Sequence, residues 1–331
     1  MSKPILAVIG GGSWATALVK IFSNNVSQIH WWVRSEDTAA FMRKYKHNPN
    51  YLSDVEINLD KVNVSNDLAT IISSSDIIIL AVPSAFLKPT LAAIKPEAFK
   101  NKIVFSAIKG IIPDDLLIIG DYLREKLNIP INNIGVITGP CHAEEVAMER
   151  LSYLTLASVD IETANTLAAL MSCRYIKTLV SDDIYGTEYS AVLKNVIAIA
   201  SGICHGVGYG DNFQAVLISN AIREIQRFVE AVHPITRDIN DSAYLGDLLV
   251  TAYSSFSRNR MFGTMIGKGY SVKFAQLEMN MIAEGYYATN CIYELNKKYN
   301  VHMPITRAVY HVLYEKIAPR IEMKLLSDQL N

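Results

Sequence analysis

Lys194 is a candidate general base because of the residues on either side of it. It lies in the stretch SAVLKNVIAI, residues 190–199, which is dominated by small and apolar side chains. On a helix its neighbours three and four positions away would be Ser190, Ala191, Ile197 and Ala198. Partial desolvation disfavours the charged form of a lysine and lowers its pKa toward the range of a base that accepts a hydroxyl proton. The alternative is a lysine that extends from an apolar helix face to water.

A second polar cluster is Ser257-Arg258-Asn259-Arg260, which places two guanidinium groups, an amide and a hydroxyl in four residues. Guanidinium groups match phosphate geometry bidentately, so the cluster favours a phosphorylated small substrate. A solvated polar turn is the alternative. Asp247 precedes an apolar run and is equally consistent with a helix N-cap. The histidines show no spacing typical of a proton relay.

A glycine-rich motif near the start of the chain predicts a dinucleotide site. The apolar run from Ile5 to Ile9 is typical of a buried parallel strand. Gly10, Gly12 and Ala15 then occupy the three small-residue positions of a G-x-G-x-x-G/A fingerprint. A helix beginning near Ser13 would direct its free N–H groups and its dipole at a diphosphate. A structural glycine turn in another α/β protein is the alternative.

The end of the second predicted strand bears on the choice of cofactor. The residues 28–33 are rich in β-formers and end at Arg34-Ser35. A basic residue here suits the 2′-phosphate of NADP, whereas an acidic residue suits the ribose of NAD. Arg34 therefore favours NADP, although Glu36 keeps NAD possible. Arg34 as a solvated residue at the end of a strand is the alternative.

The chain order predicts an α/β fold with two domains. Further apolar strands are expected at residues 76–82, 102–108 and 134–137, separated by helical patterns. This alternation predicts a Rossmann-like, doubly wound, mostly parallel sheet over residues 1–183. Ligands bind at the carboxyl ends of such strands, so Lys109 and Gly139 are site candidates. An all-helical domain is predicted over residues 184–331, with helices near 187–204, 213–232, 246–253, 273–297 and 304–317.

Composition narrows the function classes. The chain of 331 residues has 31 basic and 32 acidic residues, a formal net charge of −1, which argues against a nucleic-acid partner. The four cysteines form no C-x-x-C pair and match no histidine spacing, so neither a metal site nor a disulfide framework is expected. Reduced thiols in the cytoplasm are the expectation. No uncharged apolar run is long enough to span a bilayer, so stable membrane insertion is not expected.

Several of these segments together resemble the bacterial-type NAD(P)-dependent glycerol-3-phosphate dehydrogenases. The resemblance follows the chain in order, to MPI at 303–305. Its six main blocks are GGGSWATAL (10–18), AIKG (107–110), GPCHAEE (139–145), LKNVIA (193–198), GDL (246–248) and SRNRMFG (257–263). It implies reversible hydride transfer that interconverts glycerol 3-phosphate and dihydroxyacetone phosphate, with NADP or NAD as cofactor. In the synthetic direction this reaction supplies glycerol 3-phosphate for phospholipid synthesis, and a homodimer is the family's expectation.

The resemblance also implies roles for single residues. Lys194 matches the general base, and Lys109 matches a lysine shared by substrate and cofactor. The expected substrate contacts are Lys109, Gly139, Cys141, Lys194, Asp247, Ser257, Arg258 and Asn259. The expected cofactor contacts are Gly10, Gly12, Ser13, Trp14, Ala15, Arg34, Lys109, Ala143, Arg258, Ile282 and Glu284.

Two residues depart from the family's pattern. Ala15 replaces the common third glycine, which the motif tolerates, and Cys141 stands where a hydroxyl residue is usual. A thiol is a poorer hydrogen-bonding group, so the contact of Cys141 with substrate is in question. Two other functions stay open: a catalytically silent nucleotide-sensing protein, and a related two-domain dehydrogenase of hydroxy acids.

Overall fold

The structure is a computed structural model that describes residues 4–279 and 283–331. The chain folds into two compact units, each with a hydrophobic core. The first comprises the residues up to Ile108 together with Ile119–Ile184, and the second comprises Lys109–Ile118 and Tyr185–Asn331. The sequence predicts one boundary, between residues 183 and 184. It gives no sign that the short segment from Lys109 packs with the helices that follow.

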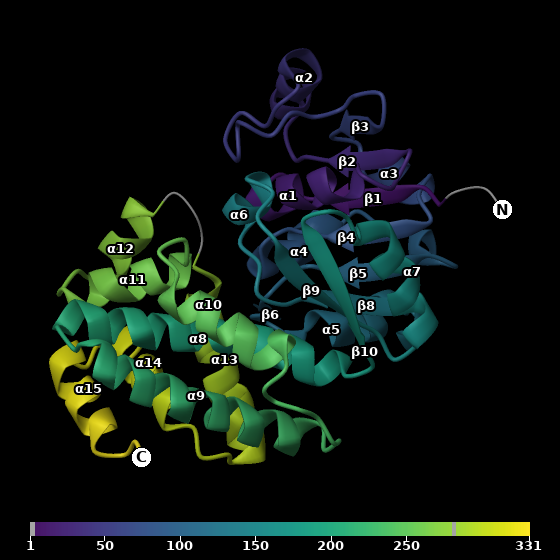
Figure 1. The fold of residues 1–331 in the computed structure, drawn as a ribbon. Helices are drawn as coiled ribbons and strands as arrows, with labels where there is room; N and C mark the ends of the chain where they lie inside the picture. Colours follow the sequence, from purple (N-terminus) through teal and green to yellow (C-terminus); the bar gives the residue numbers. More distant parts are fainter. Residues whose placement is uncertain (1–3, 280–282) are drawn as a thin grey trace. The chain divides into compact units, whose positions relative to one another are not determined.

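The first unit is built on an eight-stranded sheet with the order β10-β9-β8-β5-β4-β1-β2-β3 (Figure 1). Neighbouring strands are parallel except β8 and β9, which are antiparallel. The chain builds outward in both directions from the centre, so the predicted doubly wound sheet is confirmed. The strands are β1 (Leu6–Ile9), β2 (Ile29–Trp32), β3 (Val62–Ser65), β4 (Ile77–Leu80), β5 (Ile103–Ser106), β8 (Ile134–Thr138), β9 (Ser152–Ala157) and β10 (Ile176–Ser181).

The central strands are buried because helices cover the sheet. Every residue of β1, β2 and β4 is buried, as expected for parallel strands without a solvated face. One helical layer contains α1, α6 and α7, and another contains α3, α5 and a 3-10 helix, η1. The helices are α1 (Ser13–Phe22), α2 (Glu36–Tyr45), α3 (Leu68–Ser73), α4 (Ser84–Leu91), η1 (Pro96–Phe99), α5 (Ile119–Leu127), η2 (Ile131–Asn133), α6 (Ala143–Ala147) and α7 (Ile161–Met171).

The second unit is helical apart from one small hairpin. The hairpin strands β6 (Ile111–Ile112) and β7 (Leu117–Ile118) are antiparallel. Ile111 and Ile118 are buried in the core of the helical unit, which explains why this segment packs with it. The helices are α8 (Ile184–Val207), α9 (Asp211–Val232), η3 (Ser242–Gly246, a π-helix), α10 (Asp247–Tyr253), α11 (Arg258–Gly267), α12 (Val272–Glu278), α13 (Glu284–Tyr299), α14 (Pro304–Leu313) and α15 (Pro319–Ser327).

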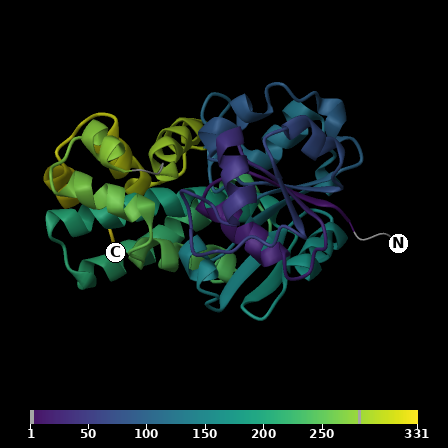
Figure 2. The same ribbon diagram turned by 90° about the horizontal axis from the view of Figure 1, so that it is seen from above.

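α8 is the core helix of the second unit. Its length and apolar composition would allow it to cross a membrane, but 83% of its most apolar window is buried inside the protein. α9 lies beside it (Figures 1 and 2), and the Ser201 hydroxyl of α8 donates a hydrogen bond to Gln214 Oε1 of α9 at 3.0 Å. The apolar stretch around Lys194 is therefore explained by burial among other helices.

Glycines on both helices allow α11 to lie against the backbone of α8. A Cβ atom at Gly202 would lie 2.1 Å from the carbonyl oxygen of Arg260, and one at Gly263 would lie 2.2 Å from that of Ile199. Real side chains do not approach backbone so closely, so a larger residue at either position would push the helices apart. The close contact fixes the start of α11 relative to the lysine on α8.

The helices of the second unit differ from the prediction in three places. The segment 273–297, predicted as one helix, contains α12, which ends at Glu278, and α13, which begins at Glu284. α11 is not among the predicted helices; it begins within the polar cluster and is capped by the Ser257 hydroxyl. α15 is not among them either, and it begins at Pro319, a residue whose fixed φ suits the first helical position.

Candidate active site

The loop Gly10–Gly12 joins β1 to α1 at the carboxyl edge of the sheet, where β1, β2 and β4 end level. Gly10 has a φ angle of +142°, and a Cβ atom there would lie 2.3 Å from the carbonyl oxygen of Ala81. Only glycine fits, because of both its backbone conformation and the neighbouring β4 segment. A Cβ atom at Gly12 would meet nothing within 4 Å. The backbone at Gly12 is therefore open to a ligand.

The start of α1 presents groups that are suited to a diphosphate. α1 begins at Ser13, its N-cap residue is Gly12, and no side chain caps it. Ala15 is fully buried, so its small size lets α1 pack closely. The indole Nε1 of Trp14 is buried and has no hydrogen-bond partner among the residues that the structure describes. Main-chain amides at a helix start without a side-chain cap and an unpartnered indole N–H both fit an anionic ligand that accepts hydrogen bonds.

Arg34 is exposed beyond the end of β2, and the structure shows no ion pair for it within residues 4–279 and 283–331. Ser35 caps α2, accepting a hydrogen bond from the Thr38 amide. The carboxylate of Glu36 forms an ion pair with Arg43. Of the two charged residues that bear on the choice of cofactor, the guanidinium is thus available and the carboxylate is occupied.

The segment after β8 carries the other predicted site residues of the first unit. Gly139 has a φ angle of +108°, and a Cβ atom there would lie 2.9 Å from the carbonyl oxygen of Tyr153. Cys141 is partly buried and forms no disulfide. Ala143 is the first residue of α6. The turn therefore depends on glycine at 139 and leads directly into a helix start.

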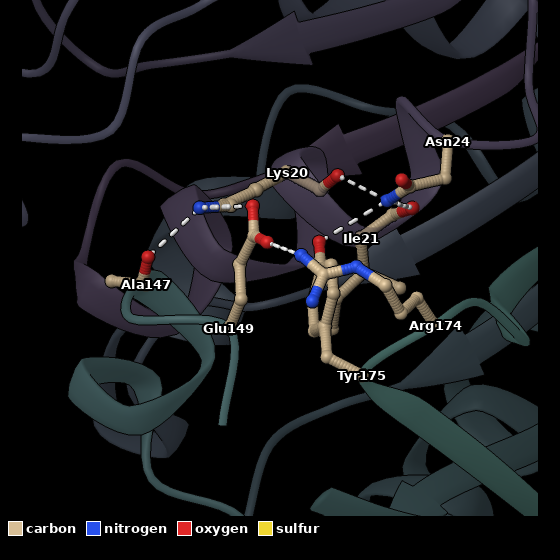
Figure 3. Close-up of polar contacts among 7 residues, drawn as sticks. All are labelled: Lys20, Ile21, Asn24, Ala147, Glu149, Arg174 and Tyr175. Carbon is tan, nitrogen blue, oxygen red and sulfur yellow. Dashed lines mark hydrogen bonds and ion pairs between the residues drawn. The ribbon is translucent and has the colours of Figure 1, made fainter. Parts of the chain in front are cut away.

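Lys20 of α1 holds the far end of α6 (Figure 3). Its Nζ donates to the carbonyl oxygen of Ala147 at 2.8 Å and lies 3.2 Å from a carboxylate oxygen of Glu149. Glu149 in turn pairs with Arg174. Beside them, Asn24 donates to the hydroxyl of Tyr175 at 3.1 Å. These contacts fix α6, and with it Ala143, against the helix that follows the glycine loop.

The second unit contains a buried cluster of two lysines and one aspartate. Lys194 of α8 donates a hydrogen bond to Oδ1 of Asp247, and Lys109 Nζ lies 3.3 Å from Oδ2 of the same carboxylate. The side chain of Asp247 is 1% exposed, that of Lys194 is 5% and that of Lys109 is 17%. Asp247 begins α10, but its carboxylate binds the lysines and does not cap the helix. One carboxylate thus orients two amines from separate parts of the chain.

Burial makes the Lys194 amine easier to deprotonate. Desolvation lowers the pKa of Lys194 from 10.5 to about 7, and the positive charge of Lys109 acts in the same direction, while the carboxylate of Asp247 opposes both. A lysine with a lowered pKa can exchange a proton with a substrate hydroxyl near neutral pH. The arrangement is therefore chemically suited to general acid–base catalysis.

The predicted phosphate-binding residues lie at the start of α11. Ser257 caps the helix by accepting from the Arg260 amide at 3.3 Å, and Arg258 is the first helical residue. Asn259 Oδ1 accepts from the amide of Gly285 at 2.9 Å, which connects this end of α11 to the start of α13 beside Glu284. The helix start thus presents a guanidinium on a fixed backbone.

Comparison with known proteins identifies the family of this chain. Residues 5–164 match the model of the NAD-dependent glycerol-3-phosphate dehydrogenase N-terminus, and residues 183–324 match that of its C-terminus. The chain belongs to this family. It is 35% identical to the glycerol-3-phosphate dehydrogenase [NAD(P)+] of Syntrophotalea carbinolica, covering 95% of both chains, and 34% identical to that of Bacillus subtilis, covering 96% of this chain and 92% of the relative. The crystal structure of the Coxiella burnetii glycerol-3-phosphate dehydrogenase superimposes with a TM-score of 0.91 at 28% identity, covering 98% of both chains.

Within this glycerol-3-phosphate dehydrogenase fold the predicted residues divide between the two units. The first contains Gly10, Gly12, Ser13, Trp14, Ala15, Arg34, Gly139, Cys141 and Ala143, and the second contains Lys109, Lys194, Asp247, Ser257, Arg258, Asn259 and Glu284. Ile282 lies outside the described residues. Direct side-chain contact joins Lys109, Lys194 and Asp247.

One residue of the cluster was not predicted as a site residue. Asn195 follows Lys194, is buried, and donates through Nδ2 to the carbonyl oxygen of Lys109 at 2.8 Å. It therefore holds the backbone that carries the second lysine. The only signal in the sequence was its adjacency to Lys194.

Among the described residues, no group of three or more His, Cys, Asp or Glu could hold a metal ion.

Proposed function

We propose that this protein is an NAD(P)-dependent sn-glycerol-3-phosphate dehydrogenase. It interconverts glycerol 3-phosphate and dihydroxyacetone phosphate by hydride transfer between C2 of the substrate and C4 of the nicotinamide. The observation that carries the proposal is the buried Lys194–Asp247–Lys109 cluster in a chain of this family. In the reducing direction the product supplies the glycerol backbone of phospholipids.

Lys194 is the proposed catalytic residue. As hydride leaves C2, the oxygen on that carbon must lose its proton, and the neutral amine of Lys194 accepts it. In the reverse direction the ammonium returns the proton to the oxygen. Asp247 orients Lys194 and balances its charge, and Lys109 adds positive charge where negative charge develops on the substrate oxygen. A positioned acid–base group of this kind accelerates a reaction about 10²–10⁴-fold.

The glycine loop and the start of α1 fit a nicotinamide dinucleotide. We propose that Gly10, Gly12, Ser13 and Ala15 form its diphosphate site, and that Trp14 donates from the buried indole that has no partner among described residues. Further proposed contacts are Arg34, Ala143, Lys109, Arg258, Ile282 and Glu284. When bound, the nicotinamide ring supplies or accepts the hydride.

Arg258 and Asn259 are proposed to bind the substrate phosphate, together with Ser257. A guanidinium forms two parallel hydrogen bonds to phosphate oxygens, and a helix start adds the N-terminal dipole. This binding energy orients C2 for hydride transfer. Gly139 and Cys141 are proposed as further substrate contacts.

The decisive assay measures NADPH or NADH oxidation with dihydroxyacetone phosphate. We expect turnover with dihydroxyacetone phosphate and none with dihydroxyacetone, because the phosphate supplies the orienting contacts. Comparable turnover of both ketones would exclude the phosphate site. Cofactor binding without turnover of any ketone would favour a nucleotide sensor, and turnover of 2-keto acids alone would favour a hydroxy-acid dehydrogenase.

We propose NADP as the preferred cofactor. Arg34 is exposed, while Glu36 is paired with Arg43, which leaves the guanidinium to bind a 2′-phosphate. Arg34→Ala should raise the KM for NADPH about tenfold and leave the KM for NADH within about twofold, since a charge-assisted pair contributes about 1.5 kcal/mol. Glu36→Gln is the matched control on the neighbouring helix. Equal effects of Arg34→Ala on both cofactors would contradict this preference.

We also propose that the enzyme is a cytoplasmic homodimer without stable membrane insertion, as the resemblance to bacterial-type enzymes implies. The near-neutral net charge supports the absence of a nucleic-acid partner.

A further inference from the structure

Asn48, in the connection between α2 and β3, contacts the glycine loop through its side-chain amide. Its side chain is buried, with the residue 1% exposed. The amide Nδ2 donates to the carbonyl oxygen of Gly11 at 3.0 Å and to the hydroxyl of Thr16 at 3.0 Å. The Oδ1 atom accepts from the backbone amides of Asn50 and Tyr51, at 3.0 and 3.3 Å. All the hydrogen-bonding capacity of the side chain is used.

The partners leave one orientation for this amide. The carbonyl oxygen of Gly11 only accepts, and the backbone amides of residues 50 and 51 only donate. Asn48 therefore presents its NH₂ group to the glycine loop and its oxygen to its own loop. Two donors on one rigid plane join the loop before α1 to a segment distant in sequence.

These contacts determine where the amide of Gly12 points. The peptide unit between Gly11 and Gly12 is planar and trans, so its N–H is directed away from its carbonyl oxygen. Because Asn48 holds the Gly11 carbonyl on the protein side, the Gly12 N–H faces the opposite side. Space is open at Gly12, and no described residue accepts a hydrogen bond from this N–H.

The neighbouring peptide units are held in the same way. The buried indole of Trp31 donates to the carbonyl oxygen of Gly10 at 2.6 Å. The hydroxyl of Thr16, which accepts from Asn48, donates to the carbonyl oxygen of Gly12 at 3.1 Å. Three consecutive carbonyl groups are thus fixed before any ligand binds. A fixed row of amides is a preorganised anion site.

We propose that Asn48 is a positioning residue for the cofactor, acting through Gly11 and Thr16 to direct the Gly12 amide at the diphosphate. The inference rests on the proposed use of NAD(P) and adds to it a residue outside the glycine motif. Because Asn48 contacts the loop of the proposed diphosphate site, we expect its effect to fall on the affinity for the dinucleotide.

Asn48→Asp is the sharpest variant. A carboxylate keeps both acceptor contacts to residues 50 and 51 but has no donor for Gly11. We expect the Kd for NADPH, measured by quenching of protein fluorescence, to rise about tenfold or more. At saturating NADPH, kcat and the KM for dihydroxyacetone phosphate should stay within about twofold of wild type.

A pair of neutral variants at Thr16 separates positioning from charge. Thr16→Ser keeps the hydroxyl that links Asn48 to Gly12, whereas Thr16→Val removes it at nearly equal volume. We expect Thr16→Val to raise the Kd for NADPH and Thr16→Ser to restore it. If the Asn48 variants do not fold, the two Thr16 variants still test the proposal.

The matched control is Ser158→Ala, because Ser158 is a buried hydroxyl of the same unit that donates to one main-chain carbonyl, that of Ile134 at 2.7 Å. It should lower Tm without changing the Kd for NADPH.

Competition with ADP-ribose, which contains the diphosphate, should weaken in the Asn48 variant, whereas competition with adenosine 2′-monophosphate, which lacks it, should not.

Two results would overturn the inference. One is an unchanged Kd in both Asn48→Asp and Thr16→Val. The other is an equal loss of affinity for ligands with and without a diphosphate. Failure of the wild-type protein to bind NADPH or NADH would instead overturn the proposed function, so the two failures are distinguishable.

Discussion

Replacing Lys194 by alanine is expected to lower kcat at least about a hundredfold in both directions while leaving the Kd for NADPH within about twofold of wild type. Lys194 is buried on α8 and forms an ion pair with Asp247, so the fold holds its amine in one place. The proton on the C2 oxygen then has no acceptor within the cluster except Lys109, which is held by the other oxygen of the carboxylate.

The control for this prediction is Lys102→Ala. Lys102 donates to the carbonyl oxygens of Ser73 and Ser75 in the first unit, so the variant removes a lysine with defined contacts outside the cluster. Turnover should stay near the wild-type value. A loss below about tenfold in Lys194→Ala would mean that another group moves the proton, because a positioned general base contributes more than that. Stopped-flow measurement of NADPH oxidation in a single turnover separates the chemical step from product release.

The sequence was most informative about the first unit because its central strands are buried on both faces. Continuous apolar runs identified β1, β4 and β5, and the glycine fingerprint identified the loop after β1. The edge strand β10 alternates in burial and has no such run, so it was missed. The hairpin β6–β7 was missed for another reason: strands of two residues have no periodicity to detect.

The contacts around the predicted site residues were less accessible to sequence reasoning. Spacing within one helix indicated that Lys194 is partly desolvated, but the contact of Asp247 with both lysines joins segments far apart in the sequence. Asn48 and Trp31 had no signal at all, because hydrogen bonds to main-chain carbonyls follow no residue pattern. Gly202 and Gly263 became meaningful only when the close contact of α8 with α11 was known.

Asp247→Asn is expected to shift the pH dependence of both directions toward lower pH. Burial lowers the pKa of Lys194 and the charge of Asp247 raises it, so removal of that charge lowers the pKa further. In the wild type, kcat/KM for glycerol 3-phosphate oxidation should rise with pH through about 7, where the amine becomes neutral, and kcat/KM for reduction should fall over the same range. In the variant, the midpoints of both pH profiles should move to lower pH by about 1–3 units.

The size of the effect depends on the direction of the reaction. At pH 8 the reducing direction should slow about tenfold to hundredfold, because a smaller fraction of Lys194 is protonated when its pKa is lower. The rate of the oxidising direction should fall less, since the Lys194 amine that it uses is already neutral at this pH. Asp67→Asn, the same change at an exposed helix cap of the first unit, should leave the midpoints of both pH profiles unchanged. Equal slowing of both directions with unchanged midpoints of the pH profiles would show that Asp247 only orients Lys194. A purely geometric contact does not change the protonation equilibrium of the amine.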